Sequence, residues 1–370
     1  MPDAAAPIYG IDPYLDWVHA EGMPVVEGDY AVDLFEVQNG HWPRIGAKGA
    51  TVHFKGRGDF CNMFLFEVAQ GKSTAPMRHI YEDVYYVLEG HGSTQIEFPD
   101  GRKRSFEWSP KSMFSVPVNV THRFFNADGR KRALIVSTTN LPLILNTFHN
   151  PGFVFDNGYD FADRVGQEKY YAGEGDLISI RPGNHIWETN FVPDMSVLGL
   201  QSYADRGGGS SNIKFVLADG IMSGHMSEMP VGTYKKGHKH GAGTHVVCVS
   251  GHGYSLLWFA GETEFTRIEW KHGVAFPPCE AQFHQHFNTS NEPARYLATG
   301  VGNVRYPFTS AKRRSMVGEK GAKRQASSLS VKEGGNQIEY EDQDKRIHQI
   351  WLEEMKKAGV TPAMERYFNG

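Results

Sequence analysis

Apolar and polar residues alternate along two long stretches of the chain. From about Thr51, the runs TVHFKG, NMFLFEVAQG and VYYVLEGHGSTQIEF place β-branched and aromatic residues at every second position, with turns such as Pro99-Asp100-Gly101 between them. The pattern continues to about residue 145, then resumes at Ile213 and runs to about Val304. A period of two with closely spaced turns predicts many short β-strands, which are typical of a barrel or a sandwich.

Helical patterns flank these stretches. Residues 11–22 (IDPYLDWVHAEG) predict a short helix with Tyr14, Trp17 and Val18 on one face, and residues 338–358 repeat apolar side chains at helical spacing. Five parts are therefore expected: an N-terminal arm with a short helix (1–50), a first barrel (51–146), an inter-barrel connection with a few strands (147–212), a second barrel (213–306), and a basic loop with the C-terminal helix (307–370).

Composition narrows the class of protein. The 370 residues suit two domains or one duplicated domain, and a net charge of −4 gives no reason to expect nucleic acid or an anionic membrane as a partner. Three scattered cysteines fit a reducing compartment, and the N-terminus shows no export signal, so a cytoplasmic location is expected. No run reaches the roughly 18 apolar residues of a membrane span. The stretch 311–337 is basic and is expected to form a solvated arm.

Histidines are the strongest chemical signal. GTYKKGHKHGAGTHVVCVSG (232–251) places His238 and His240 two residues apart, so that both point to one face of an extended segment. His284 follows in PPCEAQFHQHFN, a second strand-like run. Imidazoles that converge inside a barrel predict a divalent-metal site.

The histidine-rich region belongs to an internal repeat. The first copy comprises 77–98 and 117–126, and the second comprises 238–259 and 278–288. The copies align at three places: Gly90-His91-Gly92 with Gly251-His252-Gly253, His122 with His284, and Asn126 with Asn288. A repeat of about 160 residues indicates one domain written twice.

The repeated blocks resemble the two signature motifs of the cupin superfamily, G-x5-H-x-H-x3,4-E-x6-G and P-x-G-x2-H-x3-N. The second copy keeps Gly232, the paired histidines, Gly251 and the His284-x3-Asn288 spacing. The resemblance covers roughly 50–145 and 215–305. It implies an all-β bicupin, with two jelly-roll barrels and short flanking helices.

The second copy lacks the glutamate of the motif. Strict spacing back from Gly251 puts Thr244 in that slot, whereas metal chemistry favours His245, which a bend in the preceding glycine-rich step would turn inward. The predicted ligands are His238, His240 and His284, with His245 as a candidate fourth.

The first copy carries a degenerate version of the same set. Met77 stands in the first ligand slot, and His79, Asp83 (or Glu82) and His122 remain as a candidate second site. Two imidazoles and a carboxylate can form a facial triad, but a thioether in place of an imidazole predicts a weakened or vacant site.

Other residues are candidates for work around the metal. His286 lies two residues after His284 and is expected to act as a base or as a hydrogen-bonding partner of the substrate, a role that His245 shares as the alternative. Trp258, Gln282 and Arg295 are candidate substrate contacts, and an arginine at the barrel mouth suits a carboxylate.

Bicupins without the glutamate are similar to the gentisate and salicylate ring-cleaving dioxygenases, which use three histidines and Fe(II), although in gentisate-type enzymes the intact site lies in the first barrel. The resemblance implies an Fe(II)-dependent dioxygenase that uses O2 and a small aromatic or hydroxylated carboxylic acid, with Mn, Ni or Zn as alternative metals. A non-oxidative metal-dependent lyase, isomerase or hydrolase and a non-enzymatic ligand-binding bicupin are the alternatives. A homodimer or homotetramer is expected, since exposed barrel edges need cover.

Overall fold

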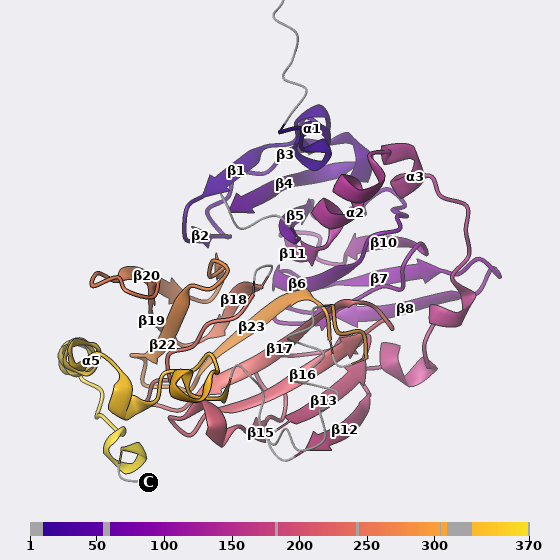
Figure 1. Ribbon diagram of the computed structural model, residues 1–370. Coiled ribbons are helices and arrows are strands. Elements are labelled where there is room, and N and C mark those ends of the chain that lie inside the picture. Colours follow the sequence, from indigo (N-terminus) through magenta and orange to yellow (C-terminus); the bar gives the residue numbers. More distant parts are fainter. Residues whose placement is uncertain are drawn as a thin grey trace, which may run out of the picture.

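The computed structural model describes residues 10–54, 60–181, 184–241, 244–303, 305–308 and 328–368. Two β-barrels lie next to each other, and each combines one large sheet with one three-stranded sheet (Figure 1). The strands from the first 140 residues are β1 (Val25–Gly28), β2 (Val32–Asp33), β3 (Gly40–Trp42), β4 (Ala47–Phe54), β5 (Asn62–Val68), β6 (Asp83–Glu89), β7 (Gly92–Glu97), β8 (Lys103–Trp108), β9 (Met113–Phe114), β10 (Thr121–Asn126) and β11 (Ala133–Thr139).

The remaining strands belong mostly to the second barrel. They are β12 (Asp176–Arg181), β13 (Asn184–Thr189), β14 (Phe191–Val192), β15 (Gln201–Ser202), β16 (Ser211–Leu217), β17 (Met222–Met229), β18 (His245–Ser250), β19 (His252–Trp258), β20 (Thr266–Lys271), β21 (Val274–Phe276), β22 (Phe283–Asn288) and β23 (Ala294–Val301). The first barrel has the strand orders β1-β4-β5-β11-β6-β9-β14 and β10-β7-β8, with β3 beside β4. The second has β12-β13-β16-β17-β23-β18-β21-β2 and β20-β19-β22, with β15 beside β16.

The two barrels exchange edge strands. β2, from the N-terminal arm, pairs with β21 of the second barrel, and β14, from the inter-barrel segment, pairs with β9 of the first. A shared hydrophobic core joins the two large sheets, with Val52 and Val136 from the first and Phe215 and Leu297 from the second. Each large sheet thus has two covered faces, one toward its own barrel and one toward its neighbour, which explains why its strands are apolar on both sides.

The helices cover the outer surfaces. They are α1 (Pro13–Ala20), α2 (Leu141–Phe148), α3 (Pro151–Phe155) and α5 (Lys345–Ala358). The helix expected in 11–22 is confirmed, with Tyr14, Trp17 and Val18 buried. The C-terminal helix is confirmed only from residue 345, because 3-10 and extended segments occupy 338–344.

One strand prediction is wrong at its end. The run RALIVSTTNLPLIL, expected to stay extended to about residue 145, leaves the strand state after Thr139 and becomes helix α2. Pro142 lies in the first turn of α2, where its fixed φ and missing N–H are tolerated.

The internal repeat has a physical basis in both barrels. A Cβ atom on Gly92 or Gly253 would lie 2.0 Å from a carbonyl oxygen of the neighbouring strand, so only glycine fits the Gly-His-Gly corner. Each repeated asparagine donates its side-chain amide to backbone carbonyls: Asn126 to Val68 and Lys131, and Asn288 to Met229 and Glu292.

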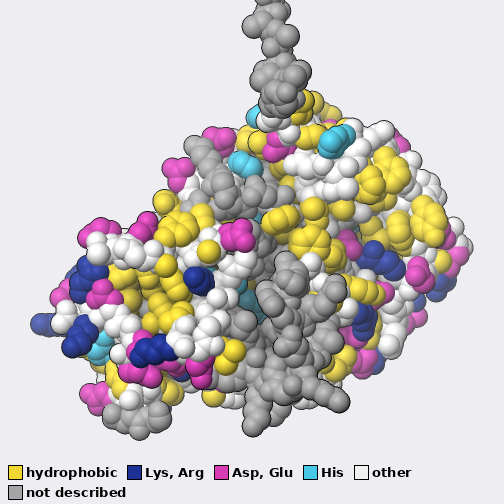
Figure 2. Space-filling model, in the orientation of Figure 1, with side chains coloured by type: hydrophobic (Ala, Val, Ile, Leu, Met, Phe, Trp, Pro, Cys, Tyr) yellow, Lys and Arg dark blue, Asp and Glu magenta, His cyan; other side chains and the backbone are white. Residues whose placement is uncertain are grey.

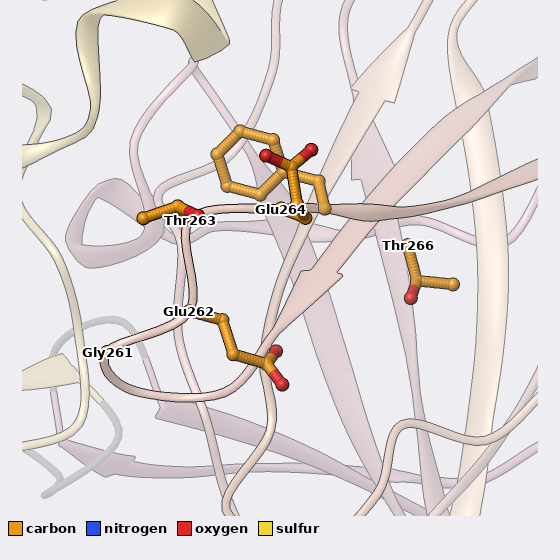
Figure 3. Close-up of a pocket in the computed structure, with 6 residues that line it drawn as sticks. Gly261, Glu262, Thr263, Glu264 and Thr266 are labelled. Atoms are coloured by element: carbon orange, nitrogen blue, oxygen red, sulfur yellow. The ribbon is translucent and has the colours of Figure 1, made fainter.

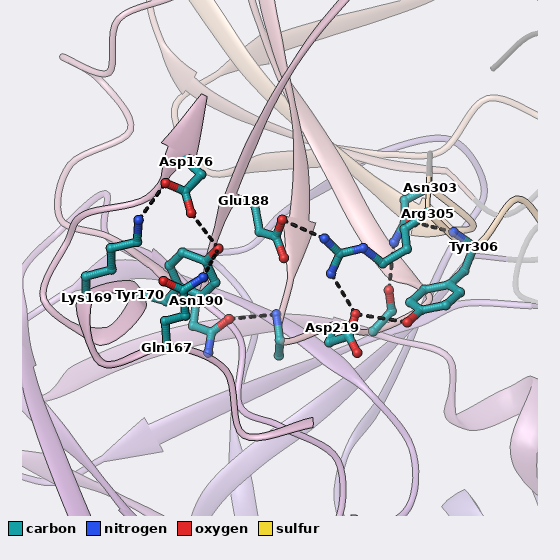
Figure 4. Close-up of polar contacts among 12 residues, drawn as sticks. Gln167, Lys169, Tyr170, Asp176, Glu188, Asn190, Asp219, Asn303, Arg305 and Tyr306 are labelled. Atoms are coloured by element: carbon teal, nitrogen blue, oxygen red, sulfur yellow. Dashed lines mark hydrogen bonds and ion pairs between the residues drawn. The ribbon is translucent and has the colours of Figure 1, made fainter. Parts of the chain in front are cut away.

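The inter-barrel segment is anchored to the second barrel by polar contacts (Figure 4). Arg305 pairs with Glu188 of β13 at 2.6 Å and with Asp219 at 2.7 Å, and Asn190 accepts a hydrogen bond from the backbone of Ala218. Residues 147–212 therefore do more than connect, since they supply β12, β13 and β15 to the second barrel.

The surface carries both signs of charge. Figure 2 shows basic and acidic side chains interspersed around the end that holds α5. The basic part of the predicted arm, 311–327, lies outside the described residues. None of the helices in the described ranges combines the length and apolarity that a membrane crossing demands.

Candidate metal centre

Three histidines meet inside the second barrel. His238, His240 and His284 each offer a ring nitrogen, and these three nitrogens lie within 4.8 Å of one another. Ring centroids are 4.2 Å apart for His238 and His284, and 4.8 Å apart for His240 and His284. His238 and His284 are buried, and His240 is partly exposed. The structure therefore brings together the three residues that the motif predicted.

Backbone pairing sets this geometry. His238 and His284 exchange two backbone hydrogen bonds, of 3.1 and 2.9 Å, so the segment before Gly241 runs alongside β22. Met77 and His122 exchange the equivalent pair in the first barrel, both 2.9 Å. The same local pairing places the ligand slots in both copies, as the repeat implies.

Each of the three rings is oriented through Nδ1. The Nδ1 atom of His284 lies 3.1 Å from the carbonyl of Gln282, that of His240 lies 2.9 Å from the carbonyl of Gly241, and that of His238 lies 3.4 Å from the carbonyl of Lys236. A carbonyl oxygen can only accept a hydrogen bond, so Nδ1 of each ring carries the hydrogen and Nε2 has the lone pair. This is the tautomer that a metal-ligating histidine needs.

The electrostatics also favour ligation. Burial lowers the pKa of His238 well below its ordinary value, and the nearby Arg206 guanidinium lowers it further. Burial lowers the pKa of His284 in the same way. Neutral imidazole is the form that binds a cation, so these rings are ready to ligate at neutral pH.

His245 lies outside this cluster. Strand β18 alternates between faces, sending Val246 into the core of the second barrel and Val247 into the core between the barrels. His245 has the parity of Val247, and its ring lies 5.7 Å from that of Phe54 in the first barrel. The structure therefore does not bring His245 to the three histidines, as its expected role of fourth ligand or base required, because its ring lies against the first barrel.

The other candidate contacts divide between the barrel interior and its outside. His286 is buried on β22 with the inward parity of His284. Trp258 stacks on Phe283 in the core beneath α5, on the outer face of the sheet. Arg295 pairs with Glu228 at 2.7 Å and faces the inter-barrel side, so neither Trp258 nor Arg295 lines the site.

Gln282 is buried close to the three histidines, where it makes hydrogen bonds within the protein. Its side-chain oxygen accepts a hydrogen bond of 3.2 Å from the backbone of Cys279, and its carbonyl orients His284. It therefore shapes the turn before β22.

Sequence reasoning missed a group of polar residues deeper in the barrel. Lys235 is 1% exposed, and its ammonium nitrogen contacts the hydroxyl of Ser227 and, at 3.1 Å, that of Tyr296. Burial lowers the pKa of Lys235 well below its usual range, and the charge of Arg206 adds to this. The segment around residue 235 is not a regular strand, so spacing alone gave no sign that Lys235 points inward.

The equivalent place in the first barrel is filled by protein. The hydroxyl of Tyr85 lies 3.1 Å from a carboxyl oxygen of Asp83 and 3.3 Å from Nε2 of His122, and His79 lies 3.5 Å from Asp83. Val246 occupies the position of Tyr85 in the second barrel. Within the described residues, only the second barrel has a three-residue group that could hold a metal.

The carboxyl of Glu82 serves another purpose. It pairs with Arg164 at 2.6 Å and accepts a hydrogen bond from the backbone of Met222 at 2.7 Å, so it ties the barrels together. Between β19 and β20, the loop Gly261–Thr266 lines a surface pocket of about 470 Å³ that holds none of the three histidines (Figure 3).

Comparison with known proteins agrees with this architecture. The sequence model of the auxin binding protein family matches residues 44–148, which is the first barrel. The crystal structure of Lactobacillus farciminis oxalate decarboxylase in complex with formate is similar, with a TM-score of 0.50 and 11% identity, over 77% of this chain and 90% of that one. A comparison with curated proteins gives no match.

Two structures of Bacillus subtilis oxalate decarboxylase are more distant. One, at pH 4.6, has a TM-score of 0.47 and 12% identity over 74% of this chain and 76% of that one. The other, from work on its Mn(II) centres, has a TM-score of 0.46 and 12% identity over 74% and 78%. The chain thus has a cupin-type fold in the two-barrel form, whereas the gentisate-type likeness is not supported at the level of a particular enzyme.

Proposed function

We propose that this chain is a metal-dependent cupin enzyme that acts without oxygen on a small carboxylic acid, at a bond next to the carboxylate. The observation that carries the proposal is the convergence of His238, His240 and His284, each oriented to present Nε2. The L. farciminis neighbour, an oxalate decarboxylase, supports an enzyme of this type. The earlier expectation of a dioxygenase becomes the second candidate.

The donor set fits a divalent first-row metal. Three neutral imidazoles suit Mn(II), Fe(II), Ni(II) or Zn(II), and Fe(II) and Mn(II) are the metals we propose to test first. Such a metal supplies Lewis acidity toward a bound oxygen atom. His238 and His284, held by paired backbone, and His240, held by the Gly241 carbonyl, would keep its position fixed.

The charge of the barrel interior supports an anionic substrate. No carboxylate belongs to the three-residue group. Among the residues that the structure describes, the side-chain nitrogen of Lys235 contacts the hydroxyls of Ser227 and Tyr296 and the ring of Tyr296. Arg206 lies close enough to lower the pKa of several interior histidines. A buried positive environment of this kind favours a ligand that brings negative charge.

A dioxygenase of small aromatic or hydroxylated acids is the second candidate. Three facial protein ligands leave positions free on an octahedral ion, and strict motif spacing puts Thr244, which is not an anionic ligand, at the place of the glutamate. A bidentate substrate and O2 would need those positions.

One experiment separates the two. Protein loaded with Mn(II) or Fe(II) is incubated with oxalate, gentisate or salicylate, with and without O2, while CO2 release, ring opening and O2 uptake are followed. We expect anaerobic turnover of a small carboxylic acid that is lost in His284→Ala and retained in His122→Ala, the matched change in the first barrel. Turnover that requires stoichiometric O2 supports the dioxygenase, and no turnover by any metal-loaded form contradicts both.

A further inference from the structure

A fourth histidine belongs to the same interior but has different partners. His286 is 2% exposed, and its ring centroid lies 5.5 Å from that of His284, 6.4 Å from that of His238 and 4.8 Å from that of Tyr296. Position alone would allow it to be a ligand, a base or a hydrogen-bond donor. The partner of its Nδ1 atom decides among these roles.

Nδ1 of His286 faces a hydroxyl rather than a carbonyl. Ser255, directly opposite on β19, places Oγ 2.7 Å from Nδ1. The indole N–H of Trp270 donates to the same Oγ at 3.0 Å. A serine hydroxyl has one proton to donate. Among the described residues, its oxygen contacts two side chains: the indole N–H of Trp270, which can only donate, and Nδ1 of His286, which can accept. The hydroxyl therefore donates to Nδ1, which leaves the ring proton of the neutral imidazole on Nε2.

This tautomer is the reverse of that in the three ligands. In His238, His240 and His284, Nδ1 faces a carbonyl and Nε2 has the lone pair. In His286, Nε2 carries hydrogen, so this atom can donate a hydrogen bond but can neither ligate a metal nor accept a proton. Nε2 is the ring nitrogen further from the backbone.

The hydroxyl–indole pair occurs in both barrels of this chain. Trp108 donates to the hydroxyl of Thr94 at 3.1 Å, as Trp270 donates to Ser255. Phe124 takes the place of His286 there. A histidine joins the pair only in the barrel that also has the three-histidine group.

We propose that Ser255 and Trp270 are positioning residues that hold His286 as an Nε2–H donor toward an anionic ligand at the metal. His286 is then neither a fourth ligand nor the general base. This role rests on the proposed function, since it requires a metal-bound anion beside His286. The tautomer itself can be measured whether or not that function holds.

The first test reads the tautomer. Long-range ¹H–¹⁵N correlation spectra, recorded before and after zinc is added, distinguish Nδ1–H from Nε2–H rings, and the spectrum of His286→Asn assigns the signal. We expect an Nε2–H ring for His286 in the wild type and in Ser255→Thr, which copies Thr94, and a loss of this preference in Ser255→Ala. An Nδ1–H or doubly protonated His286, or an unchanged tautomer in Ser255→Ala, overturns the proposal.

The second test reads ligand binding. Acetate is titrated calorimetrically into the zinc-loaded protein, whose zinc content is measured separately. We expect Ser255→Ala to weaken acetate binding about tenfold, in the range of a hydrogen bond to a charged group, with one zinc retained and affinity restored in Ser255→Thr. Equal affinity in all three proteins refutes the role of Ser255. Absence of zinc from the wild type would instead refute the proposed function and leave the tautomer result standing.

Discussion

Replacing Asp83 by asparagine tests whether the first barrel has exchanged a metal site for a hydrogen-bond network. Asp83 is 3% exposed, and burial raises its pKa from 3.8 to about 7. The Tyr85 hydroxyl donates to a carboxyl oxygen of Asp83 and lies 3.3 Å from Nε2 of His122. The side-chain oxygen of asparagine can accept the same hydrogen bond from Tyr85. Unlike the carboxyl, the amide carries no charge at any pH.

The magnitude follows from the pKa. When folding raises the pKa of a carboxyl, its protonated form stabilises the folded state relative to the unfolded state. The free energy of unfolding of the wild type therefore falls as pH rises from 3.8 to about 7. At ~1.4 kcal/mol per pH unit, the whole effect is ~4 kcal/mol, of which ~3 kcal/mol lies between pH 5 and pH 8. Asp83→Asn should lack this loss.

The assay is urea unfolding of both proteins, followed by tryptophan fluorescence at pH 5, 6, 7 and 8. The free energy of unfolding of Asp83→Asn minus that of the wild type should increase by ~3 kcal/mol from pH 5 to pH 8. Added Mn(II) should change neither curve through this barrel. A variant that becomes less stable than the wild type at pH 8, or a metal-dependent stabilisation that Asp83→Asn abolishes, would refute the reasoning and restore a metal site at His79, Asp83 and His122.

Three further changes test other parts of the account. Lys235→Met should weaken oxalate binding to the metal-loaded protein by about 10- to 100-fold without loss of metal, because it removes a buried hydrogen-bond donor from the barrel interior, whereas Lys236→Met should not. Equal losses in both, measured calorimetrically, would argue against Lys235. His245→Ala should leave metal content unchanged, since the ring packs between the barrels, and metal loss on elemental analysis would return it to the ligand set. Trp351→Ala should lower the free energy of unfolding by ~3–5 kcal/mol, because this fully buried ring attaches α5 to the second barrel, and a loss below ~1 kcal/mol in urea would show that the helix is not anchored there.

Sequence reasoning located the three-histidine group because its information is local. His238 and His240 share a face at a spacing of two, and His284 is found by the repeat with His122. The same reasoning left His245 and Thr244 as alternatives, because motif spacing favoured one and metal chemistry the other. The alternation of β18 turns His245 to the side of Val247, away from the three histidines.

Contacts between residues far apart in the sequence could not be predicted. Trp258 was expected to face the barrel interior, but it packs on the outer face of its sheet under helix α5, which begins almost 90 residues later. In the first barrel, the place equivalent to the metal centre is filled because Tyr85 contacts His122, which is 37 residues away in the sequence. The cytoplasmic location and the homodimer or homotetramer stay predictions.

The central claim is that one divalent metal is bound per chain, by the second barrel alone. Elemental analysis of protein reconstituted with Mn(II) or Fe(II) and freed of excess metal tests it most directly. The account predicts one equivalent per chain in the wild type and in His122→Ala, and none in His284→Ala. Two equivalents in the wild type, or metal that survives His284→Ala and disappears in His122→Ala, would contradict it.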